Sequence, residues 1–127
     1  MVETLKRHHI SFKNAFAGLS YALTSQPNFK IHVFLAAAAI LLGFFLEISF
    51  IEMTILVLVT FIGLAMEMMN TAIESVTDLV TTEWRESAKT AKDVAAGMML
   101  LTAIGATIIA LLILGPKILE RLPWLSF

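Results

Sequence analysis

The most constraining feature of this chain is a set of three long apolar stretches, at Ile31–Leu46, Met53–Met66 and Val94–Gly115. A helix needs about 20 mostly apolar residues to cross hydrocarbon of about 30 Å. The third stretch is long enough, and the first two need flanking residues to complete a crossing. The composition also favours the membrane, with 58% hydrophobic residues, 15% charged residues and a mean hydropathy of +0.85. We expect an all-α membrane protein with three transmembrane helices in one domain, residues 1–127.

A further helix is expected before the first apolar stretch. Large apolar residues recur there at spacings of seven, four, three and four, on one side of a helix: Leu5, Phe12, Phe16, Leu19 and Leu23. The segment is predicted to be an N-terminal amphipathic helix on the membrane surface. It ends near Ser25, because Pro27 lacks a backbone donor and disfavours helix at the residue before it.

Basic residues are distributed unequally about the apolar stretches. Seven lie before the first stretch or between the second and third, and only two follow the third: Lys6, Arg7, Lys13, Lys30, Arg85, Lys89 and Lys92, against Lys117 and Arg121. By the positive-inside rule, the N-terminus lies in the cytoplasm and the C-terminus outside. The predicted location is the inner (cytoplasmic) membrane, with several crossings.

A line of polar side chains follows the second apolar stretch. Its spacing confines the line to one side of a helix, and we call it the polar stripe: Glu67, Asn70, Thr71, Glu74 and Asp78. Carboxylates in hydrocarbon are costly and normally face a protein interior or a wet cavity, where they serve a function. Three short helices cannot shield the whole stripe from lipid, which favours an oligomer. The alternative, that these acids only contact neighbouring helices or reach toward water, stays open.

Two carboxylates at a membrane boundary suit two kinds of chemistry. One is binding of Mg²⁺, which prefers oxygen ligands, and the other is general-base catalysis by the less hydrated carboxylate. Glu67 lies deeper in the predicted span and Glu74 lies nearer to water. Glu67 is therefore the candidate base and Glu74 the candidate metal ligand.

Charged residues between the second and third stretches could bind phosphate. Lysine neutralises phosphate as a point charge, and the segment carries Glu83, Arg85, Lys89, Lys92 and Asp93. An ordinary positive-inside anchor is the alternative interpretation. The sequence has no Walker A motif, so a nucleotide site would be unconventional. Without cysteine, disulfides and thiol chemistry are excluded.

Two linked motifs resemble a known family. They read Glu67-Met-Met-Asn70-Thr71-Ala-Ile-Glu74 with Asp78, and Ala88-Lys89-Thr-Ala-Lys92-Asp93-Val-Ala-Ala-Gly97. Together they resemble the prokaryotic diacylglycerol kinase and undecaprenol kinase family, over nearly the whole chain. The resemblance implies a homotrimer that transfers the γ-phosphate of ATP to a lipid alcohol, with active sites shared between subunits. Undecaprenol and diacylglycerol both stay open as acceptors, and no nucleic acid is expected as a partner.

The resemblance also implies roles for individual residues. Glu67 would take the proton of the lipid hydroxyl, Asn70 would orient the reacting groups, and Glu74 would hold Mg²⁺ against ATP. The other nucleotide contacts carry over to Arg7, Asn14, Glu83, Arg85, Lys92 and Asp93. Asn14 stands where some relatives have an adenine-stacking aromatic residue.

One position departs from the family pattern. Gln26 stands in the turn where the family usually has a second metal-binding glutamate, and its uncharged amide is a weaker ligand for Mg²⁺. Gln26 is therefore a second candidate metal ligand after Glu74. Two non-enzymatic interpretations stay open: a small ion or proton carrier whose polar stripe lines a pathway, and a kinase homologue inactivated at Gln26.

Overall fold

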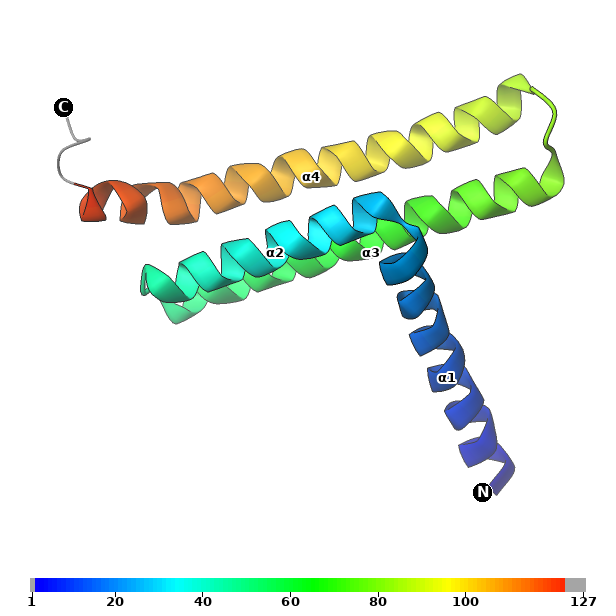
Figure 1. Cartoon of the computed structure of the whole chain (residues 1–127), viewed down its shortest axis with the longest axis horizontal. Coiled ribbons are helices and arrows are strands. Elements are labelled where there is room, and N and C mark those ends of the chain that lie inside the picture. Colours follow the sequence, from blue (N-terminus) through cyan, green and yellow to red (C-terminus); the bar gives the residue numbers. More distant parts are fainter. Residues whose placement is uncertain (1, 123–127) are drawn as a thin grey trace.

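The computed structural model describes residues 2–122, and the side chains from residue 10 onward. This part of the chain forms four helices and no strand: α1 (Val2–Ser25), α2 (Pro27–Phe45), α3 (Phe50–Val80) and α4 (Glu86–Arg121) (Figure 1). By length and apolar composition, α2, α3 and α4 can each cross a membrane. The predicted all-α membrane fold, with one helix before three spans, is confirmed.

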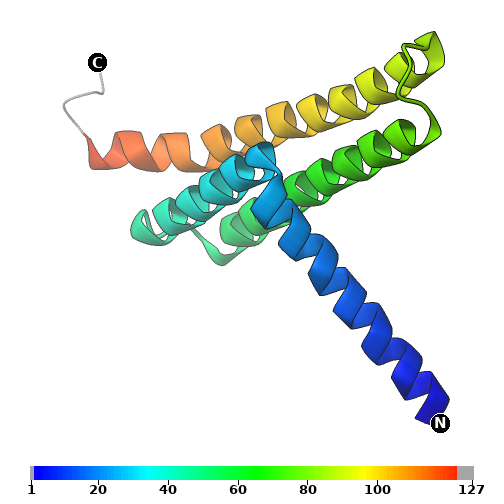
Figure 2. The same cartoon turned by 45° about the vertical axis from the view of Figure 1, so that its right-hand side comes forward.

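The three apolar helices form a bundle from which α1 departs. α3 and α4 run antiparallel beside each other, and α2 packs along the first part of α3 (Figures 1 and 2). α2 and α4 touch each other only slightly. α1 points away from the bundle at the α1–α2 junction and contacts mainly α2. Phe12, Phe16 and Leu19 are exposed on α1, as expected of side chains that enter lipid.

The helix lengths place the polar stripe at one membrane boundary. α2 has 19 residues, which at about 1.5 Å per residue matches the hydrocarbon thickness of about 30 Å. α3 has 31 residues, 12 more than α2, and starts next to the end of α2 (Figure 1). The last 12 residues of α3 therefore extend past the start of α2. Glu67 lies at this boundary, and Glu74 and Asp78 lie beyond it.

Three helix boundaries differ from the sequence expectation. Pro27 ends α1 but also begins α2, where its missing N–H forfeits no helical hydrogen bond. α3 starts at Phe50, three residues before the predicted apolar stretch, and runs on through the polar stripe to Val80 as the helical spacing of the stripe predicts, so this span is not short. α4 continues past Gly115 through Pro116. Pro116 removes a hydrogen bond, but Ile118 beyond it packs against the bundle core, which keeps this end of the helix in place.

Side-chain contacts close the end of the bundle opposite to the stripe. Ser49 and Glu52 form a capping box at the start of α3, with reciprocal bonds of 2.7 and 3.3 Å. Arg121, at the end of α4, donates to Glu47 in the α2–α3 turn at 3.1 Å and lies over the Phe45 ring. The turn is thereby joined to α4, which holds α2 and α4 on either side of α3.

Candidate active site at the membrane boundary

The polar stripe runs from the interior of the bundle to water. Glu67 and Asn70 are the buried polar residues of the described chain, with 4% and 9% of their surface exposed. Glu74 is half-buried and Asp78 is exposed. A single chain already buries Glu67, so shielding of this carboxylate does not require a second subunit. The expectation that a second subunit shields the polar stripe from lipid therefore applies only to Glu74 and Asp78.

Asn70 is positioned by a hydrogen bond to Glu74. Its Nδ2 donates to Oε1 of Glu74 across one helical turn, at 2.8 Å. Because an ionised carboxylate only accepts hydrogen bonds, the amide nitrogen of Asn70 must face Glu74. Asn70 Oδ1 is buried and has no hydrogen-bond partner among the described residues. Buried acceptors without a partner are rare, and this one can receive a donor such as a ligand hydroxyl.

Glu67 has a carboxylate with no hydrogen bond or ion pair to any described side chain. Its backbone carbonyl accepts a bond from Thr71 Oγ1 at 3.1 Å. Burying a charged group without a partner costs free energy, which favours a functional role for Glu67. Glu67 and Glu74 are about 10 Å apart along the helix axis, with Asn70 between them. The two carboxylates can therefore act on two parts of one ligand.

The hairpin between α3 and α4 gathers most of the predicted nucleotide-binding residues. It contains a cavity of about 360 Å³, which we call the hairpin cavity, and its charged lining consists of Asp78, Glu83, Arg85, Lys89, Lys92 and Asp93. Lys92 Nζ lies 2.5 Å from Asp78 Oδ1, which joins α4 to the polar stripe. Arg85 pairs with Glu83 at 3.1 Å. Lys89 pairs with Asp93 within α4.

These ion pairs leave the charged lining of the hairpin cavity without net charge. A polyphosphate must therefore displace a carboxylate from a lysine or bind together with a cation. The paired side chains keep between 39% and 77% of their surface exposed. Exposed ion pairs contribute only about 0–1 kcal/mol each. Exchange of a carboxylate for a phosphate at Lys92 is therefore energetically feasible.

Asn14 on α1 does not join α3 within one chain. Asn14 is exposed on α1, about 16 Å from the junction along a helix that leads away from the bundle (Figure 2). Gln26 is the N-cap residue of α2, and its side chain makes no capping hydrogen bond. Its amide is available to a ligand. The side chain of Arg7 lies outside the described residues.

The acidic residues do not form a metal cage by themselves. Among the described residues, no group of three or more His, Cys, Asp or Glu side chains is arranged to hold a metal ion. Mg²⁺ commonly uses one or two carboxylates and completes its shell with water and substrate phosphates. Glu74 fits this requirement only together with phosphate oxygens. A metal here would belong to the nucleotide complex.

One contact of the hairpin is not evident from the motifs alone, and a second follows from helical spacing within one motif. Asp78 belongs to the polar stripe, but its partner Lys92 follows only when α3 and α4 form an antiparallel hairpin. Lys89 and Asp93 are four residues apart on α4, which is the spacing of a helical ion pair. The ion pair between Lys89 and Asp93 could therefore have been predicted from the sequence.

Comparison with known proteins identifies the family of this chain. A sequence profile of the family described as prokaryotic diacylglycerol kinase matches residues 13–114. The chain belongs to the prokaryotic diacylglycerol kinase family. The resemblance seen in the two motifs is thus confirmed, and the chain is classed with phosphotransferases that use an alcohol group as acceptor. Arg7 lies outside the matched range.

The curated relatives of this chain are named either diacylglycerol kinase or undecaprenol kinase. Diacylglycerol kinase from Synechocystis sp. is 43% identical over 112 residues, 87% of this chain but 64% of that protein, so the chain spans less than two thirds of this relative. Undecaprenol kinase from Bacillus subtilis is 39% identical over 114 residues, 90% of this chain and 93% of that protein. A diacylglycerol kinase from Helicobacter pylori is 35% identical over 92 residues, 72% of each chain. The names leave the acceptor lipid undecided.

Proposed function

We propose that this chain is an ATP-dependent lipid kinase that phosphorylates the hydroxyl of undecaprenol or diacylglycerol at the cytoplasmic boundary of the membrane. The Glu67 carboxylate supports this most strongly. Glu67 is a buried residue, its carboxylate has no partner among the described side chains, and it lies at a membrane boundary one turn from Asn70. A hydroxyl from the membrane and a phosphate from water can meet at this depth. Family membership supports the same reaction.

Glu67 acts as the general base in this proposal. Its carboxylate takes the proton of the lipid hydroxyl while the hydroxyl oxygen forms a bond to the γ-phosphorus. The bond from that phosphorus to the β-phosphate oxygen breaks, and ADP leaves. Asn70 is a positioning residue, because it lies one turn from the base and its Nδ2 holds the Glu74 carboxylate one further turn along α3. Positioning and charge neutralisation supply most of the rate in phosphoryl transfer.

Glu74 is the proposed ligand for Mg²⁺. Asn70 engages its Oε1 atom, which leaves Oε2 for a metal. When bound, Mg²⁺ neutralises the negative charge of the ATP phosphates. Gln26 offers an amide oxygen as a second, weaker ligand, in keeping with its side chain making no capping bond. One carboxylate with phosphate oxygens is a donor set that Mg²⁺ accepts.

The hairpin cavity is the proposed place for the nucleotide. Lys92 would exchange Asp78 for a phosphate oxygen, and Asp93, Glu83 and Arg85 would line the remainder of the site. This arrangement requires the hairpin and the N-terminus to lie in the cytoplasm and the C-terminus outside. The basic residues of the hairpin support that orientation in the inner membrane.

Lys92→Ala is expected to raise KM for ATP about 10- to 100-fold, because a hydrogen bond to a charged group contributes about 1.5–3 kcal/mol. KM for the lipid alcohol should change little. Initial rates at varied ATP and at varied lipid separate the two constants. Lys117→Ala, at the other end of α4, is the matched control. An unchanged KM for ATP in Lys92→Ala would exclude Lys92 from the nucleotide site.

Gln26→Glu is expected to lower the Mg²⁺ concentration needed for half-maximal activity, because a carboxylate is a stronger ligand than an amide. Titration of activity with Mg²⁺ at fixed ATP measures the change. Asn28→Asp adds the same charge two residues away and should leave the Mg²⁺ requirement unchanged. If Gln26→Glu behaves like this control, the α1–α2 turn does not reach the metal.

We also propose a homotrimer with shared active sites. α1 leads away from its own bundle, so Arg7 and Asn14 can complete a site only against α3 of another subunit (Figure 1). Coexpressed Glu67→Gln and Arg7→Ala subunits should therefore recover part of the activity that each loses alone. Glu67→Gln with Glu74→Gln should recover none, because both residues lie on one helix. Equal results for the two pairs in verified mixed oligomers would contradict shared sites.

The proposed reaction can be tested directly. The purified full chain is placed in lipid nanodiscs with Mg²⁺, ATP labelled at the γ-phosphate, and either undecaprenol or diacylglycerol. Label is expected in the extracted lipid phosphate. If neither lipid acquires label while the protein stays folded, the kinase proposal fails. An ion or proton carrier, or an inactivated homologue, would then be the better interpretation.

A further inference from the structure

One ion pair connects the hairpin cavity to the polar stripe. Lys92 Nζ on α4 lies 2.5 Å from Asp78 Oδ1 on α3. The other ion pairs of the cavity join residues at most four apart in the sequence. Among the described residues that line this cavity, Lys92 and Asp78 therefore form the ion pair that links α3 to α4.

Lys92 is the least exposed charged side chain of the hairpin cavity. It keeps 39% of its surface exposed, whereas the other five charged side chains of the lining keep 60–77%. A partly buried ammonium loses some of its hydration, and a nearby opposite charge stabilises its charged form. Asp78 supplies this opposite charge when no phosphate is bound.

The ion pair adds little to the stability of the hairpin. α3 and α4 are joined by residues 81–85 and pack against each other as neighbouring antiparallel helices (Figure 1). An ion pair between side chains as exposed as these contributes little to folding. This favours a role for Asp78 in ligand binding.

The position of Asp78 relates the ion pair to the proposed phosphate site. Asp78 follows Glu74 by four residues on the same face of α3, about 6 Å along the helix axis. Lys92, held by Asp78, therefore lies near the place where the ATP phosphates would meet the metal on Glu74. A phosphate that binds Lys92 must compete with Asp78, because both groups accept hydrogen bonds from the same ammonium.

We propose that Asp78 is an internal competitor of the ATP phosphates for Lys92. In the empty site the Asp78 carboxylate holds the ammonium in place, and a phosphate displaces it on binding. The displaced carboxylate then lies near phosphates of the same sign of charge, which weakens the complex further. When the nucleotide leaves, Asp78 takes Lys92 back. Asp78 thus sets nucleotide affinity and release through Lys92, an inference that rests on the proposed nucleotide site.

Asp78→Asn is expected to lower Kd for ATP about three- to tenfold, because asparagine has no charge with which to compete for Lys92. If the ion pair served to fasten the hairpin, the same substitution would weaken binding, so the sign of the effect decides. Equilibrium binding of ATP with Mg²⁺ to the full chain, in nanodiscs without a lipid alcohol, measures Kd without turnover. ADP should dissociate from Asp78→Asn more slowly by a similar factor. Unchanged or weaker ATP binding in folded Asp78→Asn would overturn the inference.

Two control variants separate competition from a change in net charge. Asp78→Glu keeps a carboxylate that can reach Lys92, so Kd should stay within about twofold of wild type. Glu86 is exposed in the first turn of α4, lies outside the lining of the hairpin cavity, and forms no ion pair among the described residues. Glu86→Gln removes the same charge and should also change Kd less than about twofold. An equal gain in Glu86→Gln and Asp78→Asn would contradict the competitor role.

A double-mutant cycle tests whether Asp78 acts through Lys92. Lys92→Ala removes the amine for which the carboxylate and the phosphate compete, so most of the gain from Asp78→Asn should disappear in that background. An equal gain in both backgrounds would show general repulsion rather than competition. Thermal melting verifies the fold of each variant, and Asp78→Ser is a second uncharged substitution. Unfolding of both uncharged variants would show that the ion pair is structural and would overturn the inference.

ATP binding and lipid labelling together separate this inference from the kinase proposal. If Asp78→Asn tightens ATP binding but wild type labels no lipid, the kinase proposal fails and the competitor role stands. If wild type labels lipid and Asp78→Asn binds ATP no more tightly, the competitor role fails alone. If neither wild type nor Asp78→Asn binds ATP, both proposals fail.

Discussion

Glu67→Gln is expected to lower lipid phosphorylation by about 10²- to 10⁴-fold, the range in which a positioned base contributes to proton transfer. Glutamine keeps the shape of the side chain but cannot accept the hydroxyl proton. The Glu67 carboxylate has no partner among the described side chains, so the substitution breaks no ion pair. Stability and ATP binding should therefore be retained. Initial rates and equilibrium ATP binding measure the two effects separately.

Glu52→Gln is the matched control for this variant. It makes the same substitution on α3 at the opposite end of the bundle, and glutamine also serves in a capping box, so the cap on Ser49 is kept. Activity within about twofold of wild type is expected, because surface substitutions away from special features change little. Turnover retained by purified Glu67→Gln would remove Glu67 from the role of base.

Glu74→Gln is expected to abolish activity nearly completely at cellular Mg²⁺ concentrations. Glutamine still offers Asn70 Nδ2 an oxygen to bond, so the positioning contact at 2.8 Å is preserved. What is lost is the carboxylate charge, which Mg²⁺ requires alongside the phosphates. Activity measured against Mg²⁺ should recover only at much higher metal concentration, if at all.

Gln26→Ala supplies the comparison for Glu74→Gln. It removes the weaker, uncharged ligand and should cost far less activity than the loss of the Glu74 carboxylate. A larger loss in Gln26→Ala than in Glu74→Gln would reverse the proposed order of the two ligands. Equal activity of Glu74→Gln and wild type across the Mg²⁺ range would remove Glu74 from the metal site.

Features of the fold that depend on periodicity and length could be predicted from the sequence. Apolar stretches predicted three spans, and helical spacing placed Glu67, Asn70 and Glu74 on one face, as the structure shows. These properties follow from the rise and turn of one helix. The motifs also identified the family, which the profile match confirms.

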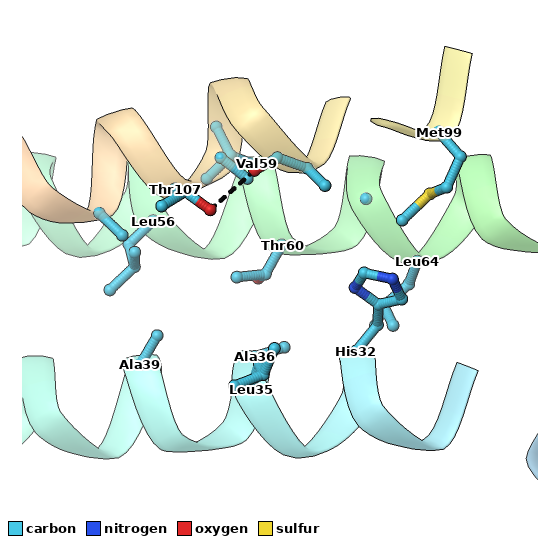
Figure 3. Close-up of a pocket in the computed structure, with 14 residues that line it drawn as sticks. His32, Leu35, Ala36, Ala39, Leu56, Val59, Thr60, Leu64, Met99 and Thr107 are labelled. Atoms are coloured by element: carbon cyan, nitrogen blue, oxygen red, sulfur yellow. Dashed lines mark hydrogen bonds between the residues drawn. The ribbon is translucent and has the colours of Figure 1, made fainter. Parts of the chain in front are cut away.

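Features that depend on tertiary packing could not be predicted in the same way. The pairing of Lys92 with Asp78 needs the relative placement of two helices, and the continuation of α4 past Pro116 depends on packing of Ile118. A cavity beside Gly63 likewise has a lining from α2, α3 and α4 together (Figure 3). The direction of α1 also depends on its packing against α2. Because α1 leads away from the bundle, Asn14 lies far from α3 of the same chain.

We propose that ATP phosphorylates a lipid hydroxyl at the polar stripe of α3, with Glu67 as base. The most direct measurement is a single-turnover assay in nanodiscs, with ATP labelled at the γ-phosphate and ATP binding measured in the same preparation. Wild type and Glu52→Gln should move label into the lipid, while Glu67→Gln should bind ATP equally and transfer label at least about 100-fold more slowly. Equal transfer rates in Glu67→Gln and wild type would contradict the claim.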